Sequence, residues 1–555
     1  MSRYSYEAFA VKTPPELGGD GTAIDVYPVA IIGAGPVGLT AAIDLATRGI
    51  SSVVLDDNNV VSIGSRAICW AKRTLEIFYR LGVGERMLEK GVTWKVGRLF
   101  HGTDEVYNFN LLPESGHKYP AFINLQQYYV EQYLVERCHD FPELIDLRFS
   151  NKVISHEESG KAITLAVETT EGNYSLRASY VLACDGAGSP TRKRMQLPFT
   201  GQEFDENFLI ADVEMPVSPF ETDEPERWFW FEPEFHSGQS ALLHKQPDNI
   251  YRIDLQLGPD TDPAAEATEE KVIPRIKAMV GDTPFTFDWL SVYKFRCASL
   301  SEFIHGRMIF VGDSAHVVSP FGARGGNGGI QDVDNLCWKL AMLINGEAST
   351  ELLSTYNEER GHGARENILN SSRATNFMTP KSPIEHLFRN EVLSLAKHTT
   401  FAQKLINSGR LSVPCSLASH ALQTPGTARL PVGSALLDAP VSSDAGDSWL
   451  VRELQGQFFL LGIGGIDLPV IDQLDRVGID QSEQKATSYL QFKDTSGLVV
   501  ERYGQDCAYL IRPDGHIAAS FCGAISADEA RTALQRACGQ ELASALKAAS
   551  HSGRH

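Results

Sequence analysis

Three glycines and one aspartate near the N-terminus have the spacing of a dinucleotide-binding turn. The segment GAGPVG starts at Gly33, directly after an apolar run, and Asp56 lies 18 residues beyond its last glycine. Gly33 permits a tight turn, Gly35 lets the backbone approach a pyrophosphate, and Gly38 allows a helix to pack closely on a strand. The helix that begins at Pro36 presents free N–H groups to phosphates, and Asp56 can accept hydrogen bonds from ribose hydroxyls. The sequence therefore predicts a dinucleotide site.

Two further segments combine a carboxylate with glycines at the end of an apolar run. VLACDGAGSPTR places Asp185 before a glycine turn, and GRMIFVGDSAH places Asp313 directly after Gly312. The loop that follows contains Gly325, Gly326 and Asn327. A carboxylate at a strand end can bind ribose or ribityl hydroxyls. A glycine loop that opens a helix presents backbone amides to a group that gains negative charge on reduction.

A third kind of chemistry is predicted on a strand near residue 254. Over residues 251–257 the alternation of a strand puts Arg252, Asp254 and Gln256 on one face. His244 lies on the neighbouring predicted strand. Asp254 is the first candidate for a catalytic base or a substrate anchor, and His244 is the second. The alternative for each is a solvent-facing or structurally paired side chain.

The elements that must position these residues alternate between strand and helix. A β-α-β unit is expected over residues 29–56, and helices are expected over 74–88 and 126–137. Strand-like stretches recur from 208 to 257, separated by Pro, Gly, Asp and Asn. A buried strand over 308–312 precedes the glycine loop, and a helix is expected from about Gly329 to Ile344. This order is typical of a nucleotide-binding α/β domain interrupted by a sheet-rich module.

Composition narrows the class of protein. The 555 residues carry a net charge of −20, which argues against nucleic acid or an anionic membrane as a partner. No run of eighteen apolar residues and no apolar leader occurs, so a cytoplasmic enzyme is expected. The nine cysteines include no C-x-x-C pair, so neither a zinc site nor a redox dithiol is indicated.

The three cofactor segments, in this order and spacing, resemble those of the class A, single-component flavoprotein aromatic monooxygenases, whose prototype is para-hydroxybenzoate hydroxylase. The resemblance covers roughly residues 26 to 370, and the chain length is similar to that of the longer phenol hydroxylase and 3-(3-hydroxyphenyl)propionate hydroxylase members. It implies bound FAD, reduction by NADH or NADPH, and hydroxylation of a phenolic or aromatic substrate with O2 through a flavin C4a-hydroperoxide. No metal is implied.

The resemblance also implies roles for individual residues. Arg66 matches an arginine near the FAD pyrophosphate, and Gln127 matches a glutamine that contacts the cofactor. Pro320 matches a proline whose carbonyl lies beside substrate and flavin. Related phenol hydroxylases carry a tyrosine near the position of Asp254, so this aspartate is a departure from the pattern. His316 is expected to have a hydrogen-bonded, structural role rather than a catalytic one.

The expected fold is α/β: a Rossmann-like FAD-binding domain, an inserted antiparallel-sheet substrate domain and a thioredoxin-like C-terminal domain. The FAD-binding domain is expected over residues 26–105, 126–198 and 297–375, and the substrate domain over 106–125 and 199–296. A helical connection is expected over 376–423. The C-terminal domain, over 424–555, lacks a cysteine pair, so a role in stability or in a homodimer is expected for it.

Two alternatives to the hydroxylase remain open at the level of sequence. A flavin-dependent halogenase shares the fold, but the stretch WFWFEP at residues 228–233 matches the halogenase W-x-W-x-I-P motif only superficially. A non-catalytic binding protein on the same fold, as in the Rab GDP-dissociation inhibitors, has no need for the intact aspartates and glycine loop of a flavin cradle.

Overall fold

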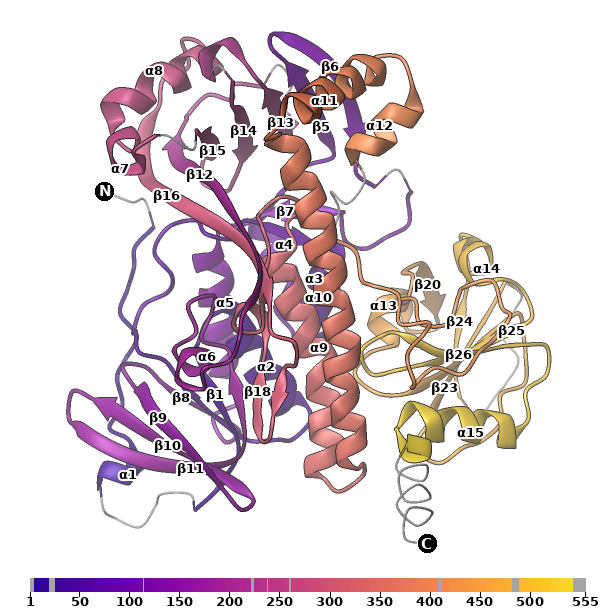
Figure 1. The fold of residues 1–555 in the computed structure, drawn as a ribbon. Coiled ribbons are helices and arrows are strands. Elements are labelled where there is room, and N and C mark those ends of the chain that lie inside the picture. Colours follow the sequence, from indigo (N-terminus) through magenta and orange to yellow (C-terminus); the bar gives the residue numbers. More distant parts are fainter. Residues whose placement is uncertain are drawn as a thin grey trace, which may run out of the picture.

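The glycine turn and its β-α-β unit open a mixed sheet, as the sequence predicts. The computed structural model describes residues 4–18, 25–112, 114–220, 224–236, 238–258, 261–407, 412–481 and 489–542. Three parts are visible in Figure 1: the cofactor-binding α/β part, a large sheet above it, and a C-terminal unit beside the long helices α9 (Gly325–Ile344) and α10 (Thr350–Met378).

The first sheet has the strand order β17-β18-β11-β1-β2-β8, and β10 and β9 extend from β11. Its strands are β1 (Tyr27–Ile32), β2 (Ser52–Leu55), β8 (Ile145–Arg148), β9 (Lys152–Ser159), β10 (Ala162–Thr169), β11 (Gly172–Ala183), β17 (Ile304–His305) and β18 (Met308–Phe310). Strands β2, β1, β11 and β18 run parallel, so their carboxyl ends meet at one edge. All three cofactor segments follow strands of this parallel group, which brings them together at that edge.

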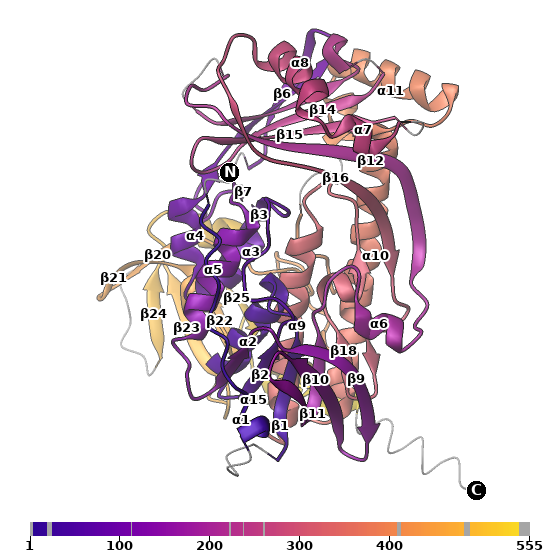
Figure 2. The same cartoon turned by 90° about the vertical axis from the view of Figure 1, so that its left-hand side faces the viewer.

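The second sheet lies across the top of the first part (Figure 2) and has the order β19-β16-β12-β15-β14-β13-β5-β6. Its strands are β5 (Val96–His101), β6 (Asp104–Asn110), β12 (Thr200–Glu214), β13 (Glu226–Phe231), β14 (Ser240–Lys245), β15 (Ile250–Leu257), β16 (Thr286–Ser299) and β19 (His316–Val317). The predicted domain boundary at residues 105/106 falls inside β6. The structure therefore moves the start of this sheet to β5, about ten residues earlier, because β5 pairs with β13. A small sheet of β3 (Cys69–Ala71), β7 (Phe122–Asn124) and β4 (Val92–Thr93) connects the two parts.

Helices cover the faces of these sheets. They are α1 (Pro15–Gly18), α2 (Pro36–Thr47), α3 (Lys72–Arg80), α4 (Gly84–Lys90), α5 (Gln127–Cys138), α6 (Pro190–Arg194), α7 (Pro263–Glu266), α8 (Glu269–Val280), α11 (Pro383–Ala396) and α12 (Thr400–Asn407). The single helix expected over 74–88 is wrong: the chain forms α3 and α4, separated by Gly82 at φ 85°, because a left-handed glycine ends a helix. Helix α9 begins at Gly325, four residues earlier than expected.

The C-terminal unit is a third sheet with the order β21-β20-β24-β23-β22-β25-β26. Its elements are β20 (Pro440–Ser443), β21 (Gly446–Trp449), α13 (Leu450–Glu453), β22 (Phe459–Ile463), β23 (Asp475–Asp480), β24 (Leu490–Lys493), α14 (Leu498–Tyr503), β25 (Cys507–Ile511), β26 (Ile517–Cys522) and α15 (Ala527–Ala537). The three strands β22, β23 and β24 are parallel, β25 is antiparallel to its neighbour β22, and β26 is antiparallel to β25. The thioredoxin-like relationship of this unit stays a prediction.

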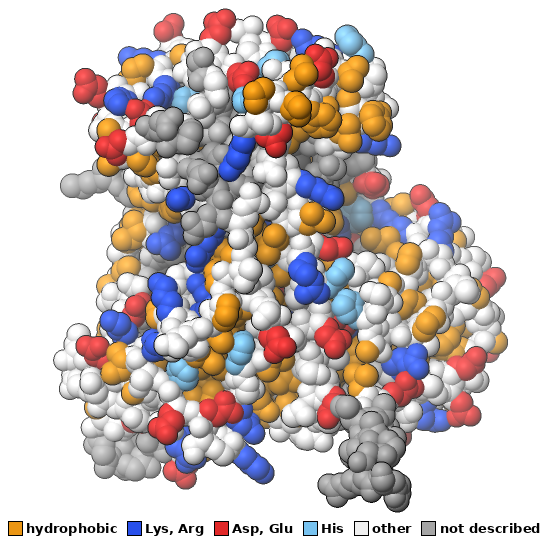
Figure 3. All heavy atoms as spheres, viewed as in Figure 1, with side chains coloured by type: hydrophobic (Ala, Val, Ile, Leu, Met, Phe, Trp, Pro, Cys, Tyr) orange, Lys and Arg blue, Asp and Glu red, His pale blue; other side chains and the backbone are white. Residues whose placement is uncertain are grey.

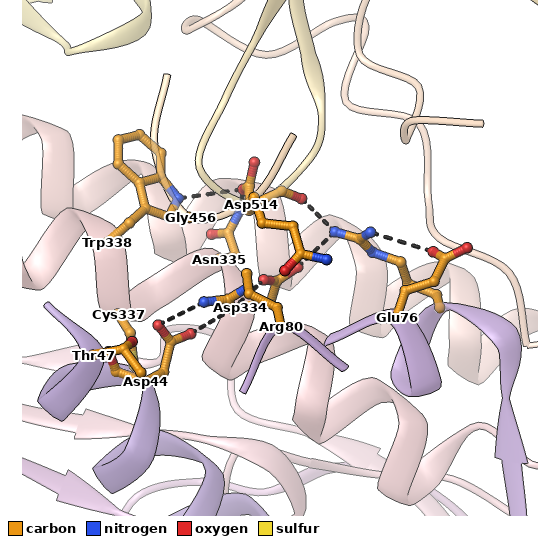
Figure 4. Close-up of polar contacts among 12 residues, drawn as sticks. Asp44, Thr47, Glu76, Arg80, Asp334, Asn335, Cys337, Trp338, Gly456 and Asp514 are labelled. Carbon is orange, nitrogen blue, oxygen red and sulfur yellow. Dashed lines mark hydrogen bonds and ion pairs between the residues drawn. The ribbon is translucent and has the colours of Figure 1, made fainter. Parts of the chain in front are cut away.

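A buried network of ion pairs and hydrogen bonds lies where this unit meets the cofactor-binding part (Figure 4). Arg80 of α3 forms ion pairs with Asp44 of α2 at 2.7 Å and with Asp334 of α9 at 2.9 Å. Asp514, in the loop between β25 and β26, accepts hydrogen bonds from Asn335 and Trp338 of α9. The loop is therefore fixed against the helix whose N-terminus opens the glycine-rich segment.

The surface mixes charged and apolar side chains (Figure 3). Exposed apolar side chains gather over α11 and α12; among them are Ile384, Leu387, Phe388 and Phe401. Within the described ranges, no helix combines the length and the apolar character needed to cross a membrane.

Candidate active site

A cavity of about 990 Å³ lies between the first and second sheets. Fourteen of the sixteen predicted site residues line it: Gly33, Gly35, Pro36, Asp56, Arg66, Gln127, Asp185, His244, Asp254, Asp313, Pro320, Gly325, Gly326 and Asn327. The other two pack behind the wall. A Cβ on Gly38 would lie 1.9 Å from the Gly33 carbonyl oxygen, and one on Gly312 would lie 3.0 Å from Val37. Both glycines are therefore required for packing rather than for contact with a ligand.

The N-terminus of α2 forms one end of the cavity. Gly35 is its N-cap, at φ −77° and without a side-chain hydrogen bond to the helix. A Cβ on Gly35 would meet no protein atom within 4 Å, so the space in front of this glycine is free for a ligand. Asp56 Oδ2 accepts a hydrogen bond from the Ala34 N–H at 2.6 Å, which fixes the carboxylate beside the turn. Burial raises the pKa of Asp56.

The second segment folds around its own aspartate. Asp185 accepts hydrogen bonds from Ser189 Oγ at 2.6 Å and from the Thr191 N–H at 2.9 Å, so it holds the start of α6. Arg192 donates to the carbonyl oxygens of Ser314 at 2.7 Å and Ala187 at 2.6 Å, and it thereby joins the second segment to the third. Asp185 is thus a positioning residue of the cavity wall as well as part of its lining.

The third segment leaves one carboxylate free to meet a ligand. Asp313 lines the cavity and makes no hydrogen bond with any described residue, and burial raises its pKa. Asn327 donates to the Cys69 carbonyl at 2.9 Å and accepts from the Ala71 N–H at 2.8 Å, so its amide holds β3 in place. The N-cap of α9, Arg324, makes no side-chain cap bond, which leaves the first backbone amides of α9 facing the cavity.

These features fit FAD on physical grounds. The N-termini of α2 and α9 have no side-chain caps and supply free backbone amides. The free space in front of Gly35 leaves room for a pyrophosphate, and the Asp313 carboxylate can accept hydrogen bonds from hydroxyl groups of the cofactor. Gln127 supports the loop that covers this region: it accepts from the Ala67 N–H at 3.1 Å and donates to Ser62 at 3.2 Å. The backbone carbonyl of Arg66 in the same loop accepts a hydrogen bond from Arg252 at 2.7 Å.

Residues behind the third segment hold it rigid. His316 Nε2 lies 2.7 Å from Asp332 Oδ2, and Arg360 Nε donates to Asp332 Oδ1 at 2.6 Å. The Asp332 carboxylate also accepts from the Gly312 N–H at 3.1 Å. His316 therefore has the structural, hydrogen-bonded position that the sequence indicates. Asp332 is a positioning residue to which the sequence analysis gave no role, although it lies in the stretch that continues the third segment.

The second sheet forms the opposite wall. Arg252 and Asp254 of β15 and His244 of β14 line the cavity, whereas Tyr251 and Ile253 point into the core under α8, as strand alternation predicts. Arg252 Nε donates to Asp254 Oδ1 at 2.8 Å, and His244 Nε2 lies 3.5 Å from Asp254 Oδ2. The two candidates for the catalytic base, Asp254 and His244, are thus neighbours, and Arg252 connects them to the loop that contains Arg66.

The electrostatics of this wall set the charge of each group. Burial alone raises the pKa of Asp254, but the Arg252 guanidinium and the adjacent His244 hold it well below its usual range. Burial and the nearby Arg227 lower the pKa of His244 to about 3. Burial raises the pKa of Asp212, on the neighbouring β12, to about 7. Asp254 is therefore a carboxylate at neutral pH and His244 is a neutral imidazole.

Sequence reasoning missed two residues of this wall, Arg227 and Asp212. Arg227 lines the cavity, and Asp212 lies on the adjacent strand in register with Arg252. Strand alternation is the signal that would have found both. Asp212 shares its face of β12 with the cavity-lining Phe208 and Ile210, and Arg227 pairs in register with His244.

Comparison with known proteins agrees with this geometry. A family model described as FAD binding domain matches residues 26–371. The 12-dehydrotetracycline 5-monooxygenase/anhydrotetracycline 6-monooxygenase of Streptomyces rimosus is 27% identical over 513 residues, which cover 88% of this chain and 94% of that protein. A 3-(3-hydroxy-phenyl)propionate/3-hydroxycinnamic acid hydroxylase of Klebsiella pneumoniae is 25% identical over 518 residues, covering 88% of this chain and 91% of that protein.

A solved structure confirms the predicted fold class. The crystal structure of the flavin-dependent monooxygenase PieE in complex with FAD and substrate superposes with a TM-score of 0.78 at 20% identity, and the match covers 94% of this chain and 100% of that one. The family model spans more than half of the chain and contains all three cofactor segments. The chain therefore belongs to the FAD binding domain family, and it is similar over most of its length to flavin-dependent monooxygenases, as its resemblance to the class A enzymes predicted.

Proposed function

We propose that this chain is an FAD-dependent monooxygenase that hydroxylates a small phenolic or other aromatic substrate with NADH or NADPH and O2. One observation carries the proposal: a single cavity is walled on one side by the three cofactor segments and on the other by the polar face of β14 and β15. Such a cavity holds a cofactor and a second, flat molecule in contact. The activities named for the two relatives support the same reaction class.

The cofactor site divides into two parts. Gly33, Gly35 and Pro36 would hold the pyrophosphate, with Asp56 at a ribose, and Asp313 and the N-terminus of α9 would hold the other end of FAD. When bound, FAD supplies the electron transfer from NADH or NADPH to O2, which amino-acid side chains cannot perform. The protein orients the substrate and excludes water around it.

Asp254, His244 and Pro320 are the proposed substrate-side residues. The low pKa of Asp254 favours the anchor role over the base role: a stable carboxylate accepts a hydrogen bond from a ring hydroxyl but takes a proton poorly. His244 is neutral and can donate or accept one hydrogen bond. The Pro320 carbonyl accepts the Ala323 N–H at 3.0 Å and keeps a second lone pair for the cavity.

The proposal is tested by NADH and NADPH oxidation in the presence of a panel of phenols and aromatic acids, with hydrogen peroxide measured in parallel. We expect one compound to accelerate oxidation many-fold, with little peroxide and a product heavier by one oxygen atom. Release of all reducing equivalents as peroxide with every compound would contradict the hydroxylase assignment. A preparation that binds no FAD would contradict its foundation.

A cytoplasmic location and a homodimer belong to the same proposal. Sedimentation velocity over a range of protein concentrations tests the dimer: a single species with the mass of one chain at every concentration would refute it.

A further inference from the structure

Four ionisable side chains form one row across the second sheet. Arg227 of β13 pairs in register with His244, His244 with Arg252, and Arg252 with Asp212 of β12. Side chains in cross-strand register lie on the same face. Three members of the row have charged or polar neighbours: Arg252 and His244 lie beside Asp254, and Asp212 accepts from Gln246 Nε2 at 3.2 Å.

Arg227 differs from the other three. Its guanidinium makes no hydrogen bond and no ion pair with any residue that the structure describes, and its Nε is shielded from solvent. Its contacts are aromatic: the guanidinium lies 4.6 Å from the ring centroid of Phe229 and 5.6 Å from that of Trp94. Burial lowers the pKa of Arg227. A half-buried cation without an acceptor is costly, and an anionic partner offsets part of that cost.

The neighbour of Arg227 is also left without a hydrogen bond. Both ring nitrogens of His244 are buried and neither makes a well-aligned hydrogen bond in the described part of the chain, although Nε2 lies 3.5 Å from Asp254 Oδ2. His244 and Arg227 both line the cavity, and the two terminal nitrogens of the Arg227 guanidinium are not among the shielded atoms, so they can reach a ligand that also lies against His244. Such donors, fixed on neighbouring strands, form a preorganised site for an oxygen anion.

Next to the row, apolar side chains form part of the same wall. Phe208 and Ile210 of β12 and Leu242 of β14 line the cavity beside the charged row. The wall thus has an apolar area for a ring and, next to it, a cationic end. Beside the row, the Asp254 carboxylate is paired with Arg252, so Arg227 has no ion-pair partner of its own among the described residues.

We infer that Arg227, assisted by His244, is the specificity-determining residue that binds an anionic oxygen of the aromatic substrate, either a carboxylate or an ionised phenol. The inference rests on the proposed function, because it assigns the substrate class of that same cavity. It makes aromatic acids and acidic phenols the preferred ligands over neutral rings of the same shape.

Binding to the full-length, FAD-loaded protein tests this without turnover. Two pairs of probes are titrated calorimetrically, without NADH and at one pH above the pKa of 4-nitrophenol: 3-(3-hydroxyphenyl)propanoate against its carboxamide, and 4-nitrophenolate against neutral 4-nitroanisole. We expect the wild type to bind at least one anion about tenfold or more tightly than its neutral counterpart, which corresponds to about 1.4 kcal/mol. Arg227→Met should reduce that preference to about one, with the neutral probe unaffected, and Arg227→Lys should retain part of it.

A matched control is available on the adjacent strand. Arg98 of β5 pairs in register with Trp228, next to Arg227, and its guanidinium binds Glu226 at 2.6 Å rather than lining the cavity. Arg98→Met should keep the full preference for the anion. The two probe pairs also separate the two sources of the oxygen, since only the carboxamide pair reports on a carboxylate.

Several results would overturn the inference. They are a wild type that prefers neither anion, an Arg227→Met protein that keeps the preference, and equal losses for anionic and neutral probes. A changed flavin spectrum with an unchanged preference would instead assign Arg227 to the cofactor. Because no turnover is involved, these results are distinct from failure of the proposed function, which appears as absence of hydroxylated product. Hydroxylation of neutral rings alone would leave that function intact and reject the role of Arg227.

Discussion

At Gly35, a larger side chain would collide with a bound ligand rather than with the protein. Its backbone, at φ −77°, suits any amino acid, and a Cβ would meet no protein atom within 4 Å. We therefore expect Gly35→Ala to keep the stability of the fold but to weaken FAD binding about tenfold or more, because the methyl group occupies the position of the pyrophosphate. Thermal unfolding of the apoprotein and titration with FAD measure the two effects.

Gly188 provides the control for this substitution. A Cβ there also meets no atom within 4 Å, but Gly188 does not line the cavity. Gly188→Ala should leave FAD affinity unchanged. Equal FAD affinities for the two variants would refute the placement of a phosphate at Gly35.

Asp212 predicts a dependence of stability on pH. Its pKa in the fold is raised from 3.8 to about 7, with burial as the main cause. Between these two values the unfolded chain has lost the proton that the folded chain keeps, so stability falls as pH rises through this window and levels off above about 7. Asp212→Asn removes this loss.

The measurement is urea unfolding of both proteins from acidic to alkaline pH. We expect the variant to gain stability relative to the wild type as pH rises, by on the order of 2–4 kcal/mol across the window. A difference between the two proteins that is constant with pH would show that Asp212 titrates normally in the fold.

At the scale of elements, an ionic cluster holds three helices at fixed positions behind the cofactor site. Arg80 of α3 binds Asp44 of α2 and Asp334 of α9, and all three side chains are less than a tenth exposed. The Arg80 and Arg48 guanidiniums hold the pKa of Asp44 below its usual range despite its burial. The cluster therefore fixes α9, and with it the amides at the start of that helix, relative to α2.

Arg80→Met should lower the free energy of unfolding by about 3 kcal/mol, because two buried carboxylates lose a partner. Arg86 is the matched control: it forms an ion pair with Glu136 at the same 2.7 Å, but the two side chains are 49% and 42% exposed. Arg86→Met should cost less than about 1 kcal/mol. Similar losses in the two variants, measured by urea unfolding, would contradict a special role for the buried cluster.

At the scale of the whole molecule, the C-terminal unit is joined to the long helices by charges without any solvent exposure. Arg512, after β25, binds Glu359 of α10 at 2.7 Å, and Glu359 also binds Lys339 of α9 at 2.7 Å. Burial lowers the pKa of Lys339 to about 8. The unit is therefore part of the support of α9 and α10 rather than a separate appendage.

Arg512→Met should lower the free energy of unfolding of the whole molecule by about 3–5 kcal/mol, because the buried carboxylates of Glu359 and Asp514 both lose the guanidinium that pairs with them. FAD release, followed by flavin fluorescence, and loss of secondary structure, followed by circular dichroism, should both shift to lower temperature. A shift in circular dichroism alone would show that the C-terminal unit unfolds independently of the cofactor site.

The sequence by itself determined the cofactor half of this protein. A glycine turn after an apolar run and an aspartate at a strand end depend on local backbone geometry, so the first segment predicted a dinucleotide site. The resemblance of all three segments to the class A enzymes predicted FAD and the fold class. The alternation of β15 also assigned Arg252 and Asp254 to one face, because strand periodicity is local.

Only the tertiary structure decided which charges meet. Arg227, His244, Arg252 and Asp212 come from four strands, and their row exists only through the register of those strands. The partner of His316 and the ionic support of α9 likewise depend on contacts between residues that are separated in the chain: His316 and Asp332 are 16 positions apart, and Arg80 and Asp334 are 254 positions apart. Burial then sets the pKa of each group, because desolvation and neighbouring charge are properties of the folded molecule.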